Sequence, residues 1–245
     1  MNRKGVLLVG GRGTRLDSLT KDSNKHFLFI SGRPMFHYPL DTMYQAKVKE
    51  VLVISTPEDL PTFRKDLQGS NPWEFSFSFL EQSQPRGIAD GLILAEGFLD
   101  GSSSILLLGD NLFFGNYMVK LLAQAHQQTK GATIFVSHVS EPSEFGIAEL
   151  SASQKVISLQ EKPINPRSNW AVTGLYFFDE RASAWARGIR PSARGELEIT
   201  DLNLQYLTEN QLHCQMLPES VDWVDAGTPD SLTIAQGFAQ DYEQI

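Results

Sequence analysis

The sequence predicts an α/β fold built on a doubly wound, mixed and mostly parallel sheet, with a small β-rich part in its second half. Four short apolar runs lack the alternation of a half-exposed strand, and such runs are typical of central strands that are buried on both faces: residues 6–9, 51–54, 104–108 and 132–136. Segments with helical spacing of apolar residues lie between these runs. Because strand and helix alternate along the chain, right-handed crossovers and a parallel sheet are expected.

The intervening helices are expected over residues 34–47, 59–67, 88–98 and 117–128. After about residue 140 the pattern becomes richer in strands, with a predicted hairpin over 145–150 and 156–159, a longer strand over 171–178, and helices over 196–208 and 229–240. No Gly/Ser-rich or Pro-rich linker divides the chain. We therefore expect one domain over residues 1–245.

Composition excludes several classes of protein. The 245 residues are 41% hydrophobic and carry 21 Lys and Arg against 29 Asp and Glu, a net charge of −8, so neither a disordered tail nor a phosphate-binding basic surface is indicated. The single Cys214 cannot form an internal disulfide and is expected in a buried strand. No apolar run approaches the roughly 20 residues of a membrane span or the core of a signal peptide. A cytoplasmic protein without nucleic-acid or membrane partners is expected.

The first strand is followed directly by a glycine-rich loop, Gly10-Gly11-Arg12-Gly13-Thr14-Arg15-Leu16. Glycines let backbone N–H groups approach a phosphate closely. A dinucleotide fingerprint would need a third glycine where Leu16 stands, and a P-loop would need a Gly-Lys-Ser/Thr end. The loop remains compatible with a nucleoside triphosphate, while a plain tight turn is the simpler alternative.

Two carboxylates follow predicted strands. Asp110 lies in Leu108-Gly109-Asp110-Asn111, and Asp225 lies in a similar strand-to-turn context. Ligands of open α/β sheets bind at the carboxyl ends of strands, and Mg²⁺ prefers one or two carboxylates plus phosphate oxygens. Taken alone, an Asp at a strand end is more often a turn or cap residue, and Lys25 and Lys162 are each explained more simply as surface lysines. A phosphate-transfer site would use both lysines.

Several motifs together resemble one family in order and spacing. They are the glycine loop with Lys25, Leu108–Asn111, Glu161-Lys162-Pro163, Val172–Tyr176, Pro191–Asp201 and Trp223–Thr228. The chain is similar over about residues 4–240 to the bacterial glucose-1-phosphate thymidylyltransferases, within the sugar nucleotidyltransferases. The resemblance implies a Rossmann-like nucleotidyltransferase fold, with a nucleotide-binding half over about 1–115 and a sugar-binding half over about 116–245.

The resemblance also implies a reaction and a set of roles. A phosphate oxygen of glucose-1-phosphate would attack the α-phosphorus of dTTP, and pyrophosphate would leave. The implied catalytic residues are Arg15, Lys25 and Lys162. The implied nucleotide-binding residues are Gly10, Gly11, Gly13, Thr14, Arg15, Gln82, Gly87 and Asp110. The implied sugar-phosphate site is Gly146, Glu161, Lys162, Val172 and Arg194. Asp110 and Asp225 would hold Mg²⁺, and a homo-oligomer (dimer or tetramer) is implied.

The sequence departs from the family pattern at four positions near these motifs: Val9, Phe29, Asp90 (often Gln) and Phe145 (often Tyr). None of the implied charged residues is affected, so activity is expected. Alternatives remain: another sugar-1-phosphate or UTP as substrate, or an inactive sugar-nucleotide-binding homologue. The chain also ends soon after its last expected helix, and regulation through the helical tail of longer relatives is not expected. His26 beside Lys25 is expected to be structural.

Overall fold

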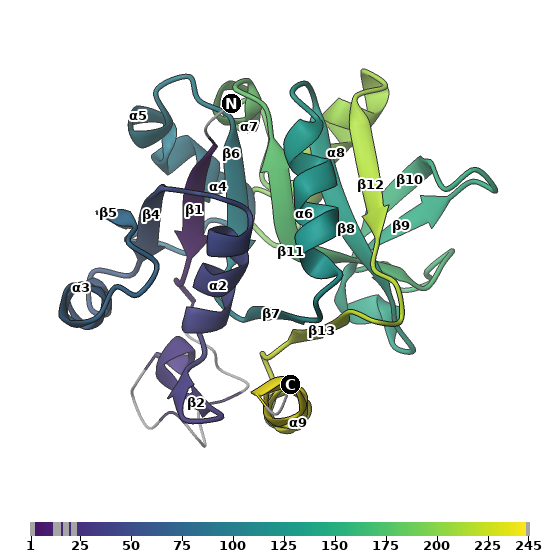
Figure 1. The fold of residues 1–245 in the computed structure, drawn as a ribbon. Coiled ribbons are helices and arrows are strands. Elements are labelled where there is room, and N and C mark those ends of the chain that lie inside the picture. Colours follow the sequence, from purple (N-terminus) through teal and green to yellow (C-terminus); the bar gives the residue numbers. More distant parts are fainter. Residues whose placement is uncertain (1–2, 12–15, 17–19, 21–23, 244–245) are drawn as a thin grey trace.

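The computed structural model of the chain describes residues 3–11, 16, 20 and 24–243, and it has an α/β architecture around one large sheet (Figure 1). Nine strands form this sheet: β1 (Lys4–Leu8), β4 (Glu50–Ser55), β5 (Ser76–Glu81), β6 (Ser104–Leu108), β8 (Ala132–His138), β9 (Gly146–Leu150), β10 (Val156–Glu161), β11 (Trp170–Phe178) and β12 (Leu212–Met216). The four apolar runs predicted as buried strands are β1, β4, β6 and β8.

The sheet combines a parallel core with one long antiparallel strand. β5, β4, β1 and β6 are neighbours in that order and run parallel. β11 then pairs antiparallel with β6 through Leu175–Phe178. The same strand also pairs with β8 over residues 170–172 and 176–178, with a register shift between the two stretches, and with β9 at Trp170 and Ala171, so the sheet branches at β11. The predicted mixed, mostly parallel sheet is confirmed.

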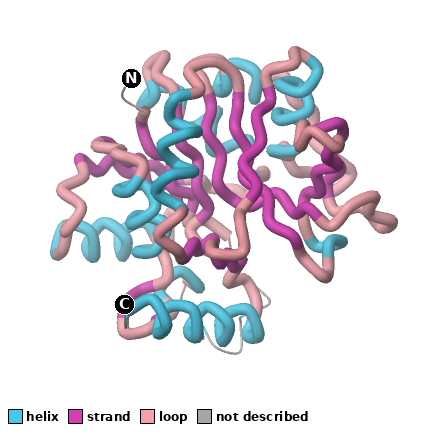
Figure 2. Tube along the Cα trace, turned by 45° about the vertical axis from the view of Figure 1, so that its right-hand side comes forward, coloured by secondary structure: helices cyan, strands magenta, loops and turns pink. Residues whose placement is uncertain are grey.

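Helices cover both faces of the sheet (Figures 1 and 2). One face carries α2 (His37–Gln45), α3 (Leu60–Gly69) and α6 (Met118–Gln127). The other face carries α4 (Ile88–Leu94), α5 (Glu96–Leu99), α7 (Ala182–Ala186) and α8 (Ile199–Thr208). Successive strand residues point to opposite faces, and so Leu7 belongs to the first core while Val6 belongs to the second. Both faces being buried explains the continuous apolar runs.

A smaller layer lies below the sheet in Figure 1. It contains β7 (Asn111–Phe114) paired antiparallel with β13 (Asp222–Asp225), the hairpin β2 (Phe29–Ile30) and β3 (Arg33–Pro34), and α9 (Pro229–Glu243). Ile30, Leu112, Val224 and Ala235 share its core. Because β7 follows β6 directly, this layer brings the chain around Asp225 beside the end of β6.

Some boundaries differ from the prediction. The helix expected from residue 34 begins at His37, because Ser31 and Gly32 adopt positive φ and form a tight hairpin turn that pairs Arg33 with Ile30. The helix expected from residue 196 begins at Ile199. Cys214 lies in β12 as expected but is only half-buried, since β12 pairs with β8 at the margin of the sheet. None of the described helices is long and apolar enough to cross a lipid bilayer.

Candidate functional site

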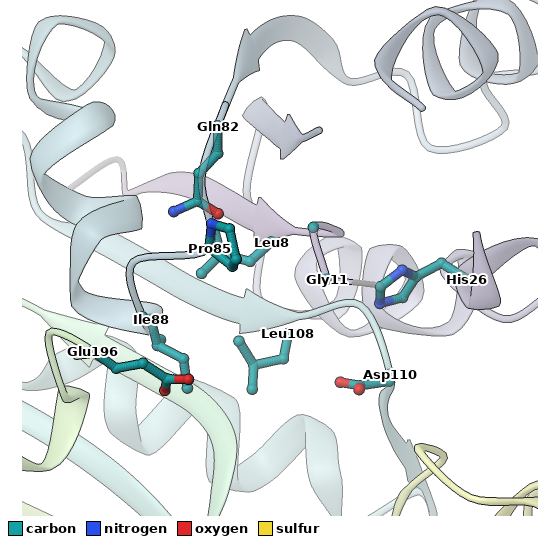
Figure 3. A pocket seen from close by; sticks show the side chains of 11 residues that line it. Leu8, Gly11, His26, Gln82, Pro85, Ile88, Leu108, Asp110 and Glu196 are labelled. Carbon is teal, nitrogen blue, oxygen red and sulfur yellow. The ribbon is translucent and has the colours of Figure 1, made fainter. Parts of the chain in front are cut away.

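A pocket of about 190 Å³ opens at the carboxyl ends of the parallel strands (Figure 3). We call it the strand-end pocket. Its lining comes from the last residues of β1 and β6 and the turns after them, from the segment between β5 and the start of α4, and from two other segments: Leu8, Gly10, Gly11, His26, Gln82, Pro85, Gly87, Ile88, Leu108, Asp110 and Glu196. Five of the residues expected to bind nucleotide therefore meet in one place: Gly10, Gly11, Gln82, Gly87 and Asp110. Gly13, Thr14 and Arg15 lie outside the described residues.

Backbone hydrogen bonds continue the sheet into the rim of this pocket. The Val9 amide donates to Ile54 O at 2.9 Å, and the Gln82 amide donates to Ser55 O at 2.7 Å. These bonds extend the parallel pairing by one residue past the ends of β1 and β5. As a result, Gly10 and Gln82 stand next to each other at the mouth of the sheet.

Position 87 requires a glycine, because its backbone angle and its neighbours leave no room for a side chain. Its φ is +102°, and a Cβ there would lie 2.5 Å from the carbonyl oxygen of Leu197. The Leu197 amide donates to Arg86 O at 2.7 Å, while the Ala89 amide donates to Leu197 O at 3.2 Å. Glu198, the residue before α8, is extended with φ −76° and ψ 132°, and the helix begins at Ile199. The two hydrogen bonds of Leu197 fix the segment after Gln82 against the second half of the chain.

Asp110 lines the strand-end pocket and forms an ion pair with Lys25. Its carboxylate accepts a hydrogen bond from Lys25 Nζ and one from Asn111 Nδ2 at 3.1 Å. Burial by itself would raise the pKa of the Asp110 carboxyl, but the Lys25 ammonium and these hydrogen bonds together hold that pKa well below its usual range. Asp110 is therefore ionised near neutral pH, and Lys25 is held beside it.

Asp225 reaches the same neighbourhood from β13. Residue 225 is the antiparallel partner of Asn111, and the Ala226 amide donates to Asp110 O at 2.8 Å. A Cβ on Gly227 would lie 2.9 Å from Asp225 Oδ1 and 4.0 Å from Lys25 Nζ, which places both charges beside that glycine. Within the described ranges no three His, Cys, Asp or Glu side chains form a metal cluster. Two carboxylates fit Mg²⁺, because this ion commonly takes one or two protein carboxylates and completes its shell with substrate phosphate and water.

His26 lies against the strand-end pocket and is 1% exposed. Its Nδ1 pairs with Asn24 Oδ1 at 2.6 Å. Burial, with a smaller effect of the neighbouring Lys25, lowers the pKa of His26 to about 3. The expected structural role agrees with this environment: the ring is neutral and fixed, and it forms part of the pocket wall.

A second, larger pocket of about 530 Å³ adjoins the first, and both are lined by Ile88 and Leu108. Four of the five residues expected at the sugar phosphate line it, together with the second expected metal ligand: Gly146, Glu161, Lys162, Val172 and Asp225. Both halves of the chain contribute to each pocket, since Glu196 lines the first and Leu108 lines both.

Glu161 is fixed in the larger pocket by two side chains. Its Oε2 accepts a hydrogen bond from Thr200 Oγ1 at 2.5 Å, and its Oε1 accepts one from Arg194 Nη2 at 3.0 Å. Arg194 is also held by Glu198, with Nη2 at 2.9 Å from Oε2. The guanidinium of Arg194 thus lies among carboxylates, and this residue is not among those that line the two pockets.

Lys162 has an unusual backbone for a lysine. Its φ of +38° lies in the left-handed region, and its amide donates to Phe145 O at 3.1 Å. Such a conformation costs on the order of 1 kcal/mol or more and is concentrated at functional sites. Glu161 and the exposed Lys162 both line the larger pocket.

Sequence reasoning missed some polar residues of the site. Asn111 is 1% exposed, and its Oδ1 accepts from the Gly174 amide and from Trp223 Nε1, each at 2.8 Å. It therefore ties β7 to β11 and β13 beside Asp110. The adjacency to Asp110 in the Leu108–Asn111 motif was the available signal. Thr200 and Glu196 carried no signal beyond their place in the Pro191–Asp201 motif.

The geometry combines features that suit transfer between two phosphorylated substrates. Two adjoining pockets each have polar groups, and their shared wall lies close to a pair of carboxylates and a lysine. Phosphoryl-type transfer depends on positioning and charge neutralisation more than on a covalent nucleophile. The arrangement could hold two anions side by side with their reacting groups near Asp110.

Comparison with known proteins agrees with this geometry. The sequence profile of the nucleotidyl transferase family matches residues 4–242. The chain is 42% identical over 242 residues to a glucose-1-phosphate thymidylyltransferase of Neisseria meningitidis, covering 99% of this chain and 84% of the relative. It is 38% identical to one of Mycobacterium tuberculosis, covering 98% of this chain and 83% of the relative.

Solved structures point the same way. A Bacillus anthracis protein assigned as a glucose-1-phosphate thymidylyltransferase, solved with sucrose, superposes with a TM-score of 0.89 at 34% identity, covering 98% of this chain and 96% of that one. A UDP-glucose pyrophosphorylase with UDP-glucose has a TM-score of 0.84 at 19% identity, with both chains fully covered, which shows the shared fold. From its sequence, its fold and the profile match, the chain belongs to the nucleotidyl transferase family, among the bacterial glucose-1-phosphate thymidylyltransferases.

Proposed function

We propose that this protein makes dTDP-glucose and pyrophosphate from dTTP and glucose-1-phosphate. The curated relatives carry the name of this activity at 38–42% identity over nearly the whole chain. The observation that supports it most directly is the pair of adjoining pockets that share Ile88 and Leu108 and have Asp110 in one and Asp225 in the other.

The strand-end pocket takes the nucleotide. The backbone at Gly10 and Gly11 faces the phosphates. Gly13, Thr14 and Arg15, which follow in the sequence, are assigned to the same nucleotide. Gln82 and the backbone at Gly87 contact the pyrimidine.

The larger pocket takes the sugar phosphate. Glu161 accepts hydrogen bonds from two sugar hydroxyls, a task for which its fixed carboxylate is suited. Gly146 and Val172 border the hexose, and Lys162 binds the phosphate. Arg194 contributes by holding Glu161 in place, and it reaches the sugar phosphate only if its contacts with Glu198 rearrange.

The reaction is a displacement at the α-phosphorus. An oxygen of the sugar phosphate forms the new P–O bond, and the bond to the β-phosphate oxygen breaks, with the electron pair leaving on pyrophosphate. Lys25 and Lys162 neutralise charge on the reacting phosphates, and Arg15 stabilises the departing pyrophosphate. Asp110 and Asp225 are the residues that would hold Mg²⁺. When bound, this ion supplies positive charge to phosphate oxygens of both substrates.

The test is release of pyrophosphate from dTTP, UTP, dCTP, ATP and GTP in turn, with glucose-1-phosphate and Mg²⁺ present. We expect the highest kcat/KM with dTTP. Exchanging glucose-1-phosphate for other hexose-1-phosphates in the same assay defines the sugar. Strong preference for another nucleotide would replace the assigned base, and silence with every pair would overturn the proposal.

A further inference from the structure

Asp90 lies directly behind the strand-end pocket and has no role so far. It is 4% exposed, and its Oδ2 accepts a hydrogen bond from Gln82 Nε2 at 2.8 Å. Its other oxygen lies 3.8 Å from Arg86 Nε, so an arginine supplies the counter-charge. Asp90 itself does not line the pocket, whereas Gln82 does.

This contact determines which way the Gln82 carboxamide points. The oxygens of a carboxylate accept hydrogen bonds, and an amide has a donating end and an accepting end. The nitrogen of Gln82 must therefore face Asp90, and the oxygen must take the other side. Gln82 Oε1 is accordingly the atom nearest Gly10, 3.4 Å from where a Cβ of that glycine would be. Figure 3 shows the oxygen on the Gly11 side of the side chain and the nitrogen on the opposite side.

We infer that Asp90 is a positioning residue for base selection: it holds Gln82 so that the pocket presents a hydrogen-bond acceptor to the pyrimidine. This inference rests on the proposed function, in which Gln82 contacts the base. It adds a residue that touches no substrate and acts only through the orientation of another side chain.

The selection follows from the edges of the bases. Thymine and uracil carry a donating N–H at N3, and they pair with the fixed oxygen of Gln82. Cytosine has an accepting nitrogen at N3, so two lone pairs would oppose each other. An unrestrained carboxamide would rotate to suit either base, because its two ends differ only in donor and acceptor character. The fixed orientation of Gln82 therefore disfavours cytosine and does not distinguish thymine from uracil.

The size of the effect follows from the cost of the reversed amide. Turning Gln82 would set its oxygen against the Asp90 carboxylate and lose a hydrogen bond to a charged group, which disfavours that orientation by about 10- to 100-fold. Apparent affinity scales with the population of the competent orientation. Loss of the contact between Asp90 and Gln82 should thus raise the apparent affinity for dCTP by about 10- to 100-fold and lower that for dTTP only about twofold.

The test substitutes Asp90→Asn, whose amide can present either its oxygen or its nitrogen to Gln82. Steady-state release of pyrophosphate is measured with dTTP, dUTP and dCTP at saturating glucose-1-phosphate. We expect the dTTP/dCTP ratio of kcat/KM to fall about tenfold or more, mainly through KM, and the dTTP/dUTP ratio to stay unchanged. Asp90→Ser, whose hydroxyl also both donates and accepts, is the second variant if the first does not fold.

Two controls separate positioning from a general structural effect. Arg86→Gln removes the counter-charge and keeps the contact between Asp90 and Gln82, so the dTTP/dCTP ratio should be retained. Gln82→Met removes the carboxamide at similar size, and in that background the change at Asp90 should no longer alter the ratio. An additive effect of the two changes would show that Asp90 does not act through Gln82.

The outcomes are distinct. An active wild-type enzyme whose dTTP/dCTP ratio is unaffected by the Asp90 variants overturns the inference and leaves the proposed function standing. A wild-type enzyme that releases no pyrophosphate with any nucleotide overturns the proposed function and the inference together. A ratio that falls only when Gln82 is present supports both.

Discussion

Acidification should destabilise the protein through His26 by an amount that can be worked from its environment. The ring is 1% exposed, and its pKa in the folded protein is about 3, whereas an unfolded histidine titrates near 6.5. Below about pH 6.5 the unfolded chain binds a proton that the folded chain refuses, and stability therefore falls with falling pH at about 1.4 kcal/mol per unit. Between about pH 7 and pH 4.5 the loss is about 2.5 kcal/mol.

The sign is fixed by the direction of the shift. The contribution of His26 is fully favourable above about pH 6.5 and is lost progressively as the pH falls toward 3, where the folded state also becomes protonated. The matched variant is His26→Asn, whose amide can still donate to Asn24 but does not titrate in this range.

Urea unfolding of both proteins, with a chelator present, gives the free energy of unfolding at each pH. Other titrating groups cancel in the difference between wild type and variant. This difference should shrink by about 2.5 kcal/mol between about pH 7 and pH 4.5. A difference that stays constant across that range would refute the buried, neutral assignment of His26.

Three further predictions concern the site. Asp110→Asn removes one of two carboxylates from the proposed metal site, so we expect kcat to fall by about two orders of magnitude or more and the dependence on Mg²⁺ to be lost. The circular dichroism spectrum should be unchanged. Near-normal turnover would contradict the assignment of Asp110. Gly87→Ala places a Cβ against the Leu197 backbone at an unfavourable φ, and should lower Tm by several degrees and raise the KM for dTTP, as thermal unfolding and kinetics would show. Arg15→Ala should reduce mainly kcat, because charge accumulates on the departing pyrophosphate, whereas Lys162→Ala should raise the KM for glucose-1-phosphate. Each contact is worth about 1.5–3 kcal/mol, and the reverse pattern in two-substrate kinetics would exchange the two roles.

Elements buried on both faces were predictable from the sequence, because burial on two sides demands continuous apolar residues. β1, β4, β6 and β8 fall in this class. β5 was missed: in Ser76–Glu81 serine alternates with phenylalanine before a leucine, and the strand is only partly buried, at the margin of the sheet. β7 was missed for another reason. Its four residues directly follow β6, and only their pairing with β13, more than a hundred residues later, makes them a strand.

For the candidate site, the motifs indicated which residues come together, but they did not indicate how the side chains are oriented. The motifs around Asp110 and Glu161 located the two pockets. That Arg194 would be held by Glu198, and Gln82 by Asp90, depends on side-chain contacts between segments that the linear pattern does not relate. Such contacts decide which donor or acceptor faces a ligand, and only the folded arrangement supplies them.

The antiparallel pairing of β11 with β6 affects how the chain folds while it is being synthesised. β6 leaves the ribosome with one side unpaired, and the strand segment that covers it, Leu175–Phe178, is made about 70 residues later. At about 5–20 residues per second, that exposed side persists for about 3.5–14 s, and an unpaired strand edge can pair with a strand of a neighbouring nascent chain during this time. We therefore expect the highest yield of soluble protein when residues 108–178 are translated without pauses. A chaperone that binds the unpaired side of β6 until β11 has been synthesised should have the same effect.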